Sequence, residues 1–563
     1  MKKGGNIELQ ENERKILCIF WGVVLFLFGG YYGFAGCLIG IFLCVFLIYK
    51  MKEEGEFSIK INIGSVAFAS LPLWYGIAVF YSVDKGMAFL GFLKIAVVPI
   101  FIILMQQYQE EREKLLNVVP IIGAGAVLLG IVVGITGVGK ELFFLSGRFG
   151  GPFQYPNTMA VYLLSGMVLW EGQRKEKKFK QWLILFLILF IGILMTGSRS
   201  VFLMTVCWML ILAWKKQETR KYCFLILGGI ITCAGIYTLL TADFQNIGRF
   251  FTFSFHSSTL TGRFLYWTDA ILMILDYPFG TGYGGYETLQ GLYQSGVYHV
   301  QYVHNDFLQY TLDIGILPSI FLVVAIVKSI LNRRLCNDKK VVLFLMTVHS
   351  AFDFDQQFLA IIFLMLLCMD IDSGKEYIFK SRVLKWFLCI GMVGIYFYFG
   401  IAQLACYVGK YEMAYKMFPV YTEAAENLLK ESNSIEQAEN IAGKLLETAP
   451  YSEVSHSTLA LTALSDHDLS AMQEEQEAAI RLAPYEPKGY EQYVRILASE
   501  LSYCAENQML DQYEKCEEAL LKIPAMIEKT EKSTSLLGKK IRDIPKVELS
   551  DEIQEYLDMF LKK

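Results

Sequence analysis

Long apolar segments alternate with short polar connections over residues 1–404. About thirteen apolar runs approach or reach the roughly 20 residues that a helix needs to cross a bilayer. They lie at 16–30, 32–49, 61–82, 86–106, 115–137, 157–171, 182–196, 200–214, 222–241, 306–327, 341–352, 356–370 and 383–404. This pattern predicts an all-α, polytopic bundle of about 12 to 13 transmembrane helices. The first run has no small-x-small cleavage site, so we expect it to be retained as a span.

Lysine and arginine clusters interrupt these runs at regular intervals. The clusters lie at 2–15, 50–60, 112–114, 174–180, 215–221, 333–340 and 375–382, and two runs separate each cluster from the next. Because positive residues favour the cytoplasmic side of a membrane, all clusters can be cytoplasmic when the N-terminus is inside. The other connections, including the long outer loop 242–305, then face outward.

This alternation predicts the structure around Arg199. A single helix over 182–214 would be roughly 50 Å long, which exceeds the ~30 Å hydrocarbon core. We therefore predict two short helices that meet at the outward turn 196–200, TGSRS. Arg199 would then lie at the outer interface.

The alternation also places the C-terminal part of the chain. The polar stretch 349–357, HSAFDFDQQ, interrupts the apolar sequence, so the final run 383–404 carries the chain outward. The alternative is one long helix over 341–370, which would leave the C-terminal part inside. We favour an extracytoplasmic position.

Residues 405–563 are rich in Glu, Lys, Ala and Leu, which predicts a soluble domain of amphipathic helices after a transmembrane domain at 1–404. The sequence TAPY at 448–451 recurs as LAPY at 482–485. The distance between the two Ala-Pro pairs equals the length of one tetratricopeptide repeat, so we predict a tetratricopeptide-like solenoid. A generic helical bundle is the alternative.

Composition excludes several classes of protein. The chain is 54% apolar with a formal net charge of -4, which argues against a nucleic-acid partner. Its 12 cysteines are scattered without a CxxC pair and are typical of small apolar side chains. Phosphate-binding loops, dinucleotide fingerprints and hydrolase motifs do not occur.

Three arginines stand at predicted outward turns in glycine- or serine-rich settings: Arg148, Arg199 and Arg263. A charge this close to hydrocarbon is costly and usually functional. Guanidinium groups bind phosphate through two parallel hydrogen bonds. Any single arginine could instead be an interfacial anchor or part of an ion pair. Three arginines on the outer face of the membrane favour a lipid phosphate or diphosphate as ligand.

His304 ends the outer loop in the sequence VHND, where Asn305 or Asp306 would cap the following helix. A histidine at a helix mouth can accept a proton from a hydroxyl near neutral pH. A purely capping role is the alternative. His256, His299 and His304 have no zinc-ligand spacing, so we expect neither a metal nor another cofactor. Within the outer loop, 261–275 predicts an amphipathic helix along the membrane surface.

Together these segments resemble the O-antigen ligase and O-antigen polymerase family of membrane glycosyltransferases over 115–372. The elements are GRFGGPFQYPN at 147–157, TGSRS at 196–200, GRFLYWTDAILMILDYPFGTGYGGYE at 262–287, VHNDFLQYTLDIGI at 303–316 and VHSAFDFD at 348–355. Each is weak alone, and their order and outward placement make the combination specific.

The resemblance implies a fold like that of the C-type membrane glycosyltransferases and catalysis at the outer face. The donor would be a glycan on polyprenyl diphosphate, usually undecaprenyl diphosphate, and the acceptor a hydroxyl on a glycan, lipid or protein. The reaction would invert the sugar without a metal. Arg199 and Arg263 would hold the diphosphate, and His304 would activate the acceptor. Substrate-binding roles would fall to Arg148, Asn157, Trp267 and Asn305.

Two alternatives remain at this point. A polysaccharide polymerase of the same family would use the same residues. A transporter or flippase of lipid-linked glycans would place polar groups along a path through the membrane midplane. Here the polar groups gather on one face, which favours an enzyme in the cell membrane that assembles surface polysaccharide.

Overall fold

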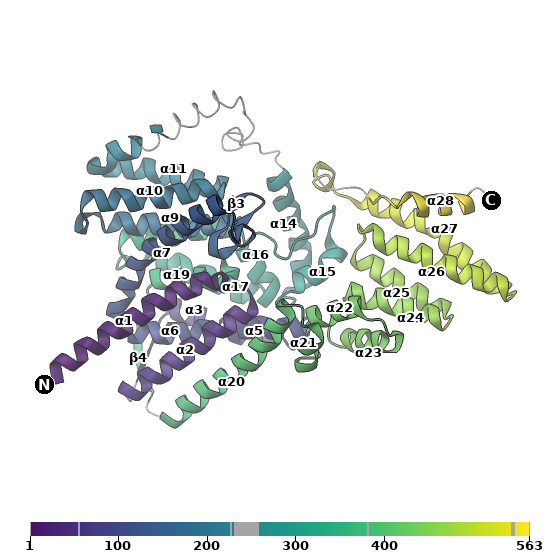
Figure 1. Ribbon diagram of the computed structural model, residues 1–563, viewed down its shortest axis with the longest axis horizontal. Coiled ribbons are helices and arrows are strands. Elements are labelled where there is room, and N and C mark those ends of the chain that lie inside the picture. Colours follow the sequence, from purple (N-terminus) through teal and green to yellow (C-terminus); the bar gives the residue numbers. More distant parts are fainter. Residues whose placement is uncertain are drawn as a thin grey trace. The chain divides into compact units, whose positions relative to one another are not determined.

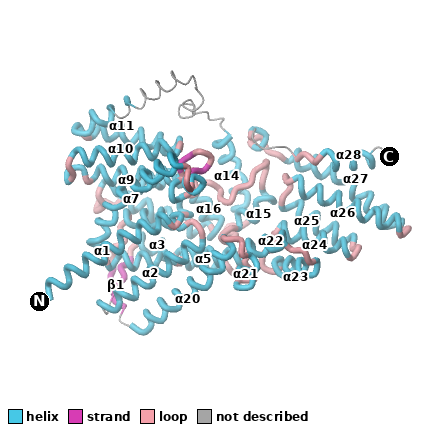
Figure 2. The backbone as a smooth tube through the Cα atoms, in the orientation of Figure 1, coloured by secondary structure: helices cyan, strands magenta, loops and turns pink. Residues whose placement is uncertain are grey.

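The computed structural model describes residues 2–54, 57–225, 228–229, 258–379, 382–541 and 547–561. The described residues are 78% helical, which confirms the all-α prediction (Figures 1 and 2). It forms two compact units. Unit 1 comprises Met1–Ser70, Val97–Ser257 and Phe321–Val393, and unit 2 comprises Leu71–Ala96, Ser258–Ile320 and Gly394–Lys563. Most of the run 222–241, and the start of the outer loop at 242–257, lie outside the described residues.

Unit 1 is a bundle of apolar helices. Its helices include α1 (Lys2–Phe26), α2 (Gly33–Glu54), α3 (Ile63–Ala69), α6 (Val97–Gln107), α7 (Gln109–Thr136), α9 (Pro156–Gly172), α10 (Phe179–Thr196), α11 (Arg199–Lys215), α18 (Asn337–Ser350) and α19 (Leu359–Cys368). The helices α7, α9 and α10 lie side by side (Figure 1). Every residue of α19 is buried, and α19 packs against α1, α6 and α7. The core of unit 1 therefore surrounds α19.

Five helices among the described residues are long and apolar enough to cross a membrane. They are Gly33–Lys50, Lys85–Gln107 (taken across a one-residue break at Ala96), Arg112–Thr136, Phe179–Thr196 and Trp386–Tyr407. Four shorter apolar helices are Lys15–Phe26, Ile63–Ala78, Ile316–Leu331 and Leu359–Cys368. A multi-pass arrangement follows, while the total of 12 to 13 spans stays a prediction.

Three predicted apolar runs are interrupted rather than continuous. The run 61–82 divides into α3 and α4 (Leu71–Ala78), the run 86–106 into α5 (Lys85–Ile95) and α6, and the run 306–327 into α16 (Asp306–Ile314) and α17 (Ile316–Leu331). A proline, Pro72, Pro99 or Pro318, stands in the first turn of each second helix. Proline fits a first helical turn but cannot continue a preceding helix, so each proline fixes the break.

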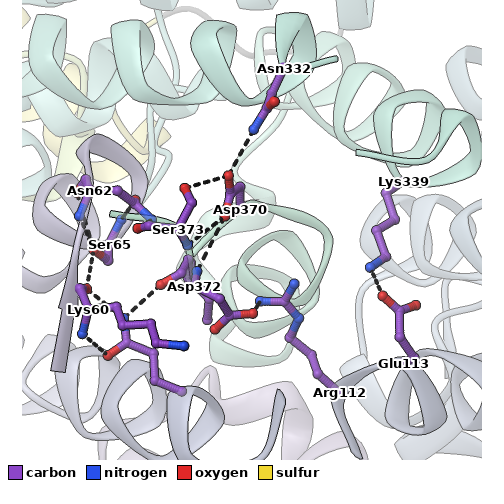
Figure 3. Close-up of polar contacts among 12 residues, drawn as sticks. Lys60, Asn62, Ser65, Arg112, Glu113, Asn332, Lys339, Asp370, Asp372 and Ser373 are labelled. Carbon is purple, nitrogen blue, oxygen red and sulfur yellow. Dashed lines mark hydrogen bonds and ion pairs between the residues drawn. The ribbon is translucent and has the colours of Figure 1, made fainter. Parts of the chain in front are cut away.

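One end of unit 1 joins several of the predicted cytoplasmic loops. The strand β1 (Phe57–Ile61) pairs antiparallel with β4 (Lys375–Phe379), and Phe57 lies opposite Phe379. Arg112 forms an ion pair with Asp372 at 2.6 Å, and Lys339 pairs with Glu113 (Figure 3). We call this end the basic face, comprising 57–61, 106–113, 332–339 and 370–379.

Contacts at the basic face are mostly made by buried groups. The side chains of Arg112 and Asp372 are only 9% and 19% exposed. The Gln106 amide donates to the carbonyl oxygens of Lys60 and Ile371 at 2.8 and 2.7 Å. Asp370 accepts from Asn332 and Ser373 (Figure 3). Loops that are more than three hundred residues apart in sequence thus share one end of the unit, as the charge pattern predicts for loops on one side of a membrane.

The opposite helix ends of unit 1 carry the predicted outward turns. A helix of the length of α7, 28 residues, extends about 42 Å, so its two ends are well separated. Turns at 27–32, 144–157, 196–200 and 349–358 contact one another at the end remote from the basic face; for example, Tyr32 donates to Gln154 at 3.3 Å. We call this end the turn face.

Unit 2 combines α4, α5, α16 and the described part of the outer loop with the C-terminal helices. The outer loop forms α14 (Ser258–Asp276) and α15 (Gly285–Tyr293), so the helix predicted at 261–275 is confirmed. The later helices are α20 (Arg382–Tyr407), which begins in unit 1, α21 (Tyr411–Met417), α22 (Thr422–Glu431), α23 (Ile435–Leu446), α24 (Glu453–Ser465), α25 (Leu469–Leu482), α26 (Pro487–Glu506), α27 (Leu510–Ser533) and α28 (Asp551–Leu561).

The C-terminal helices pack directly on the outer loop and on the start of α5. The amide of Lys85 donates to the carbonyl of Thr448, and that of Ser535 donates to the carbonyl of Ser295. At Gly291 a Cβ atom would lie 1.6 Å from the carbonyl oxygen of Leu482, so only glycine permits this approach. Both recurring Ala-Pro sequences therefore lie near these contacts. The predicted domain boundary at residue 404 falls inside α20 and remains a prediction.

Candidate functional site

Arg148 is held by backbone and side-chain acceptors at the turn face of unit 1. It begins β3 (Arg148–Phe149), which pairs with β2 (Phe144–Leu145) across a tight turn at Ser146 and Gly147. Both turn residues have positive φ, 49° and 75°, as such hairpins require. The guanidinium donates to the carbonyl of Thr196 at 2.9 Å and to Asn157 Oδ1 at 2.8 Å. The structure thus brings Arg148 and Asn157 together.

Arg199 opens α11 directly after the turn that the sequence predicts. The helix α10 ends at Thr196, Gly197 has a φ of 60°, and α11 begins at Arg199. Two helices and a turn are therefore confirmed here. Arg199 is half-buried in the first turn of α11, where the backbone N–H groups carry partial positive charge. The guanidinium and the helix terminus together favour an anionic ligand.

The segment 349–355 contributes three polar groups to the turn face that the site prediction did not include. Asp353 accepts from Tyr155 at 2.8 Å and from Asn157 Nδ2 at 2.7 Å. Asp355 accepts from Thr158 at 2.7 Å and lies 2.5 Å from His349 Nδ1. These bonds connect the segment to the start of α9.

His349 links Asp355 to the Arg199 turn. Its Nε2 atom lies 3.3 Å from the hydroxyl of Ser200. His349, Asp353 and Asp355 are each at most 1% exposed, although their sequence neighbours are mostly apolar. The sequence feature that could have identified these residues is a histidine and two aspartates inside an apolar stretch. Their partners, some 150 to 200 residues earlier, were not visible.

His304 lies in unit 2, in an unusual backbone conformation. Its φ is 52°, which non-glycine residues rarely adopt outside functional or strained sites. The Trp267 indole N–H donates to the His304 carbonyl at 3.2 Å, and Gln309 Oε1 accepts from the amide of Val303 at 3.1 Å. Asn305 caps α16, because its side chain accepts from the amides of Phe307 and Leu308. His304 is therefore fixed on both sides.

A network of buried polar side chains is connected to the His304 segment through Gln309, which bonds to the amide of Val303. Asp313 accepts from the Tyr75 hydroxyl at 2.7 Å and from the Gln309 amide at 2.9 Å. Both Gln309 and Asp313 are at most 1% exposed. Lys94, on α5, is also buried and interacts electrostatically with Asp313. The network connects α4, α5 and α16, and sequence reasoning identified none of it.

Arg263 lies one turn before Trp267 on α14. Between them, Tyr266 has its ring centre 6.0 Å from that of His304. Burial raises the pKa of the Tyr266 phenol, and the nearby charge of Arg263 lowers it in part. Arg263 and His304 therefore both lie near Tyr266 in unit 2.

Asp269 anchors the rest of the outer loop to α14. It accepts from the amide and hydroxyl of Ser295 and from the Tyr298 hydroxyl. Burial raises the pKa of Asp269, while these three hydrogen bonds lower it in part. The bonds hold the loop that leads to His304.

The predicted site residues thus form two groups. Arg148, Asn157 and Arg199 lie at the turn face of unit 1, whereas Arg263, Trp267, His304 and Asn305 lie in unit 2. Within the described residues, no group of three His, Cys, Asp or Glu side chains is arranged to hold a metal ion. His256 lies outside the described residues, and metal independence stays a prediction.

Apolar helices of spanning length, joined by polar turns that carry arginine and histidine side chains, define a multi-pass membrane protein of the all-α class. The family model described as O-antigen ligase matches residues 184–323. The resemblance to the O-antigen ligase family that the sequence predicts is thereby confirmed for this segment. No curated protein and no solved structure matches the chain.

The matched segment covers only part of the predicted family core 115–372. It includes Arg199, Arg263, Trp267, His304 and Asn305. Arg148 and Asn157 precede it, and the segment 349–355 follows it. The match does not reach residues 405–563, whose tetratricopeptide-like character stays a prediction.

Proposed function

We propose that this protein transfers a glycan from polyprenyl diphosphate to an acceptor hydroxyl at the outer face of the cell membrane. The observation that carries the proposal is the O-antigen ligase match, because it includes both Arg199 and Arg263 and also His304. The family as a whole acts in ligation or polymerisation of lipid-linked glycans. The fixed geometry of His304 and the anion-binding turn of Arg199 support the same chemistry.

In this mechanism His304 removes the proton from the acceptor hydroxyl as its oxygen attacks the anomeric carbon of the donor sugar. The bond between that carbon and the diphosphate oxygen breaks, and polyprenyl diphosphate departs without needing a proton. Arg199 and Arg263 stabilise the charge that develops on the diphosphate. The proton on His304 then passes to solvent.

The remaining predicted residues bind and orient substrate. Arg148 adds a third positive charge, and its bond to Asn157 fixes its direction. Trp267 and Asn305 act on the acceptor side, since Trp267 donates to the His304 carbonyl and Asn305 follows His304 as the cap of α16. Neither a metal nor another cofactor takes part.

The same proposal assigns a topology. The N-terminus and the basic face lie in the cytoplasm, and the turn face, the outer loop and the C-terminal helices lie outside. Contacts of the C-terminal helices with the outer loop and with Lys85 support this assignment, because the charge pattern independently places both of those partners outside.

Reconstitution of the purified full-length protein in proteoliposomes tests the function. The vesicles receive an undecaprenyl-diphosphate-linked glycan and an acceptor glycan, and mass spectrometry follows the products. We expect a new glycosidic bond and free undecaprenyl diphosphate. Movement of intact donor between leaflets without a new bond would identify a transporter and contradict the proposal. An acceptor that is a growing chain of the same repeat would identify a polymerase.

Chelation tests the metal-independent part of the mechanism in the same vesicles. We expect EDTA to leave the transfer rate unchanged, since arginines neutralise the leaving group. A strong loss that zinc or magnesium restores would contradict this expectation.

A further inference from the structure

The segment 349–355 contacts both arginine-bearing turns of unit 1. Asp353 and Asp355 are 0% and 1% exposed, so their charges require hydrogen-bond partners. Both oxygens of each carboxylate have such partners. Asp353 uses Tyr155, Asn157 and the amide of Phe354, and Asp355 uses Thr158 and His349. Carboxylates with every oxygen occupied hold their neighbours in fixed positions.

One chain of contacts leads to Arg199. The His349 ring lies between the Asp355 carboxylate, 2.5 Å from Nδ1, and the Ser200 hydroxyl, 3.3 Å from Nε2, so it connects the two side chains. Ser200 follows Arg199 in the first turn of α11. An anchored Ser200 side chain fixes the rotation of that turn, and with it the direction in which Arg199 projects.

A second chain leads to Arg148. Asp353 accepts from Asn157 Nδ2 at 2.7 Å, which fixes the orientation of the amide. The opposite atom, Asn157 Oδ1, then faces the Arg148 guanidinium at 2.8 Å. The Thr196 carbonyl, at the end of α10, holds the Nε atom of the same arginine. Asp353 therefore acts on Arg148 through one intervening side chain.

We infer that His349, Asp353 and Asp355 are positioning residues that hold Arg148 and Arg199 in a fixed relation to bind one diphosphate. The inference rests on the proposed function and extends it to a segment outside the matched residues 184–323. A rigid pair of guanidinium groups binds an anion more tightly than a mobile pair, because less side-chain entropy is lost on binding.

Ser200, His349 and Asp355 also share the order of groups in a nucleophilic triad. A nucleophile would need oxyanion donors beside it. The nearby Ser198 amide already donates to Thr196 Oγ1 at 3.2 Å, and the His349 ring is buried. The geometry therefore favours positioning, and reaction of Ser200 with a fluorophosphonate probe would contradict it.

Binding of undecaprenyl diphosphate without a sugar, measured on the detergent-solubilised full-length protein, tests the inference. We expect Ser200→Ala, His349→Gln and Asp353→Asn each to weaken binding about 2- to 10-fold, as expected for loss of one hydrogen bond. Thr205→Ala is the matched control on α11, since its hydroxyl bonds only to its own helix at the Val201 carbonyl among the bonds described, and it should bind like wild type. In transfer assays the variants should raise the KM for donor and leave the KM for acceptor unchanged.

A double-mutant cycle separates positioning from general stability. In an Arg199→Ala background, Ser200→Ala and His349→Gln should weaken binding less than about 2-fold, because their effect passes through Arg199. Asp353→Asn should likewise lose its effect in an Arg148→Ala background. If the loss of affinity in each double variant equals the product of the losses in the two single variants, the positioning role is overturned and the proposed function stays intact. Failure of the wild-type protein to bind undecaprenyl diphosphate would overturn both.

Discussion

At the scale of single residues, the proposed function makes the arginine side chains responsible for stabilising the leaving group. Arg199 combines its own charge with the N-terminal end of α11, and Arg263 lies on α14 beside Tyr266. A planar guanidinium can bind two diphosphate oxygens at once, whereas an ammonium group acts as a point charge. The account therefore depends on the geometry of these groups as well as on their charge.

Arg199→Lys and Arg263→Lys should each lower the transfer rate on the order of 10²- to 10³-fold, comparable to the loss of one preorganised donor. Steady-state kinetics in proteoliposomes measures this. Arg174→Lys is the matched control, because Arg174 lies in a predicted cytoplasmic cluster on the side opposite the predicted site, and the rate should change little. Wild-type rates for both lysine variants would reduce the two arginines to membrane anchors.

Glu287 is a residue whose titration should affect how the C-terminal helices dock. Burial and the neighbouring charges of Glu426 and Glu423 raise the pKa of Glu287 to about 7. His299 Nε2 lies 3.6 Å from the same carboxylate, which is 38% exposed, so solvent weakens these effects. The folded state binds the Glu287 proton more tightly than the unfolded state does.

The sign of the stability effect follows from this difference. The Glu287 contribution is fully present below the ordinary glutamate pKa and is lost as pH rises to about 7. Glu287→Gln should therefore raise the thermal stability of the purified protein at pH 8 more than at pH 5. Equal shifts at the two pH values would show that this carboxylate does not titrate in the interface.

At the scale of secondary-structure elements, the sequence predicts what depends on local order. The turn at 196–200 followed from run length and charge, and the helix at 261–275 from apolar spacing. The helix breaks near Pro72, Pro99 and Pro318 were also visible as prolines, although the hydrophobic pattern alone treated each run as continuous.

Elements that depend on distant partners were not predictable. The pairing of β1 with β4 places Phe57 opposite Phe379. Neither five-residue strand has a sequence feature that identifies the strand with which it pairs. Similarly, VHSAFDFD was recognisable as a family element, but the contact of His349 with Ser200 requires the folded bundle. The polar residues that the sequence does not identify as candidates are those whose partners lie on other helices.

At the scale of the whole molecule, the predicted topology assigns the loops of the basic face and those of the turn face to opposite sides of the membrane. The basic face gathers loops rich in lysine and arginine, and the turn face gathers glycine-rich turns with site residues. In unit 2 the C-terminal helices contact the outer loop. Each grouping agrees with the alternation predicted from charge alone.

Thiol labelling of single-cysteine variants tests the topology directly. Ser465→Cys, at the exposed end of α24, should react with a membrane-impermeant reagent in intact cells whose outer wall is permeable. The native Cys336, exposed at the predicted cytoplasmic end of α18, is the matched control and should react only after lysis. Labelling of Ser465→Cys only after lysis would place the C-terminal helices inside and remove one crossing.

The central claim is that His304 is the base that activates the acceptor. Single-turnover transfer by the purified protein, with saturating donor, measures this step most directly. We predict that His304→Ala lowers the rate on the order of 10²- to 10⁴-fold with donor binding unchanged. His299→Ala, at an exposed histidine of the same outer loop, should keep the wild-type rate. A His304→Ala rate near that of wild type would contradict the account.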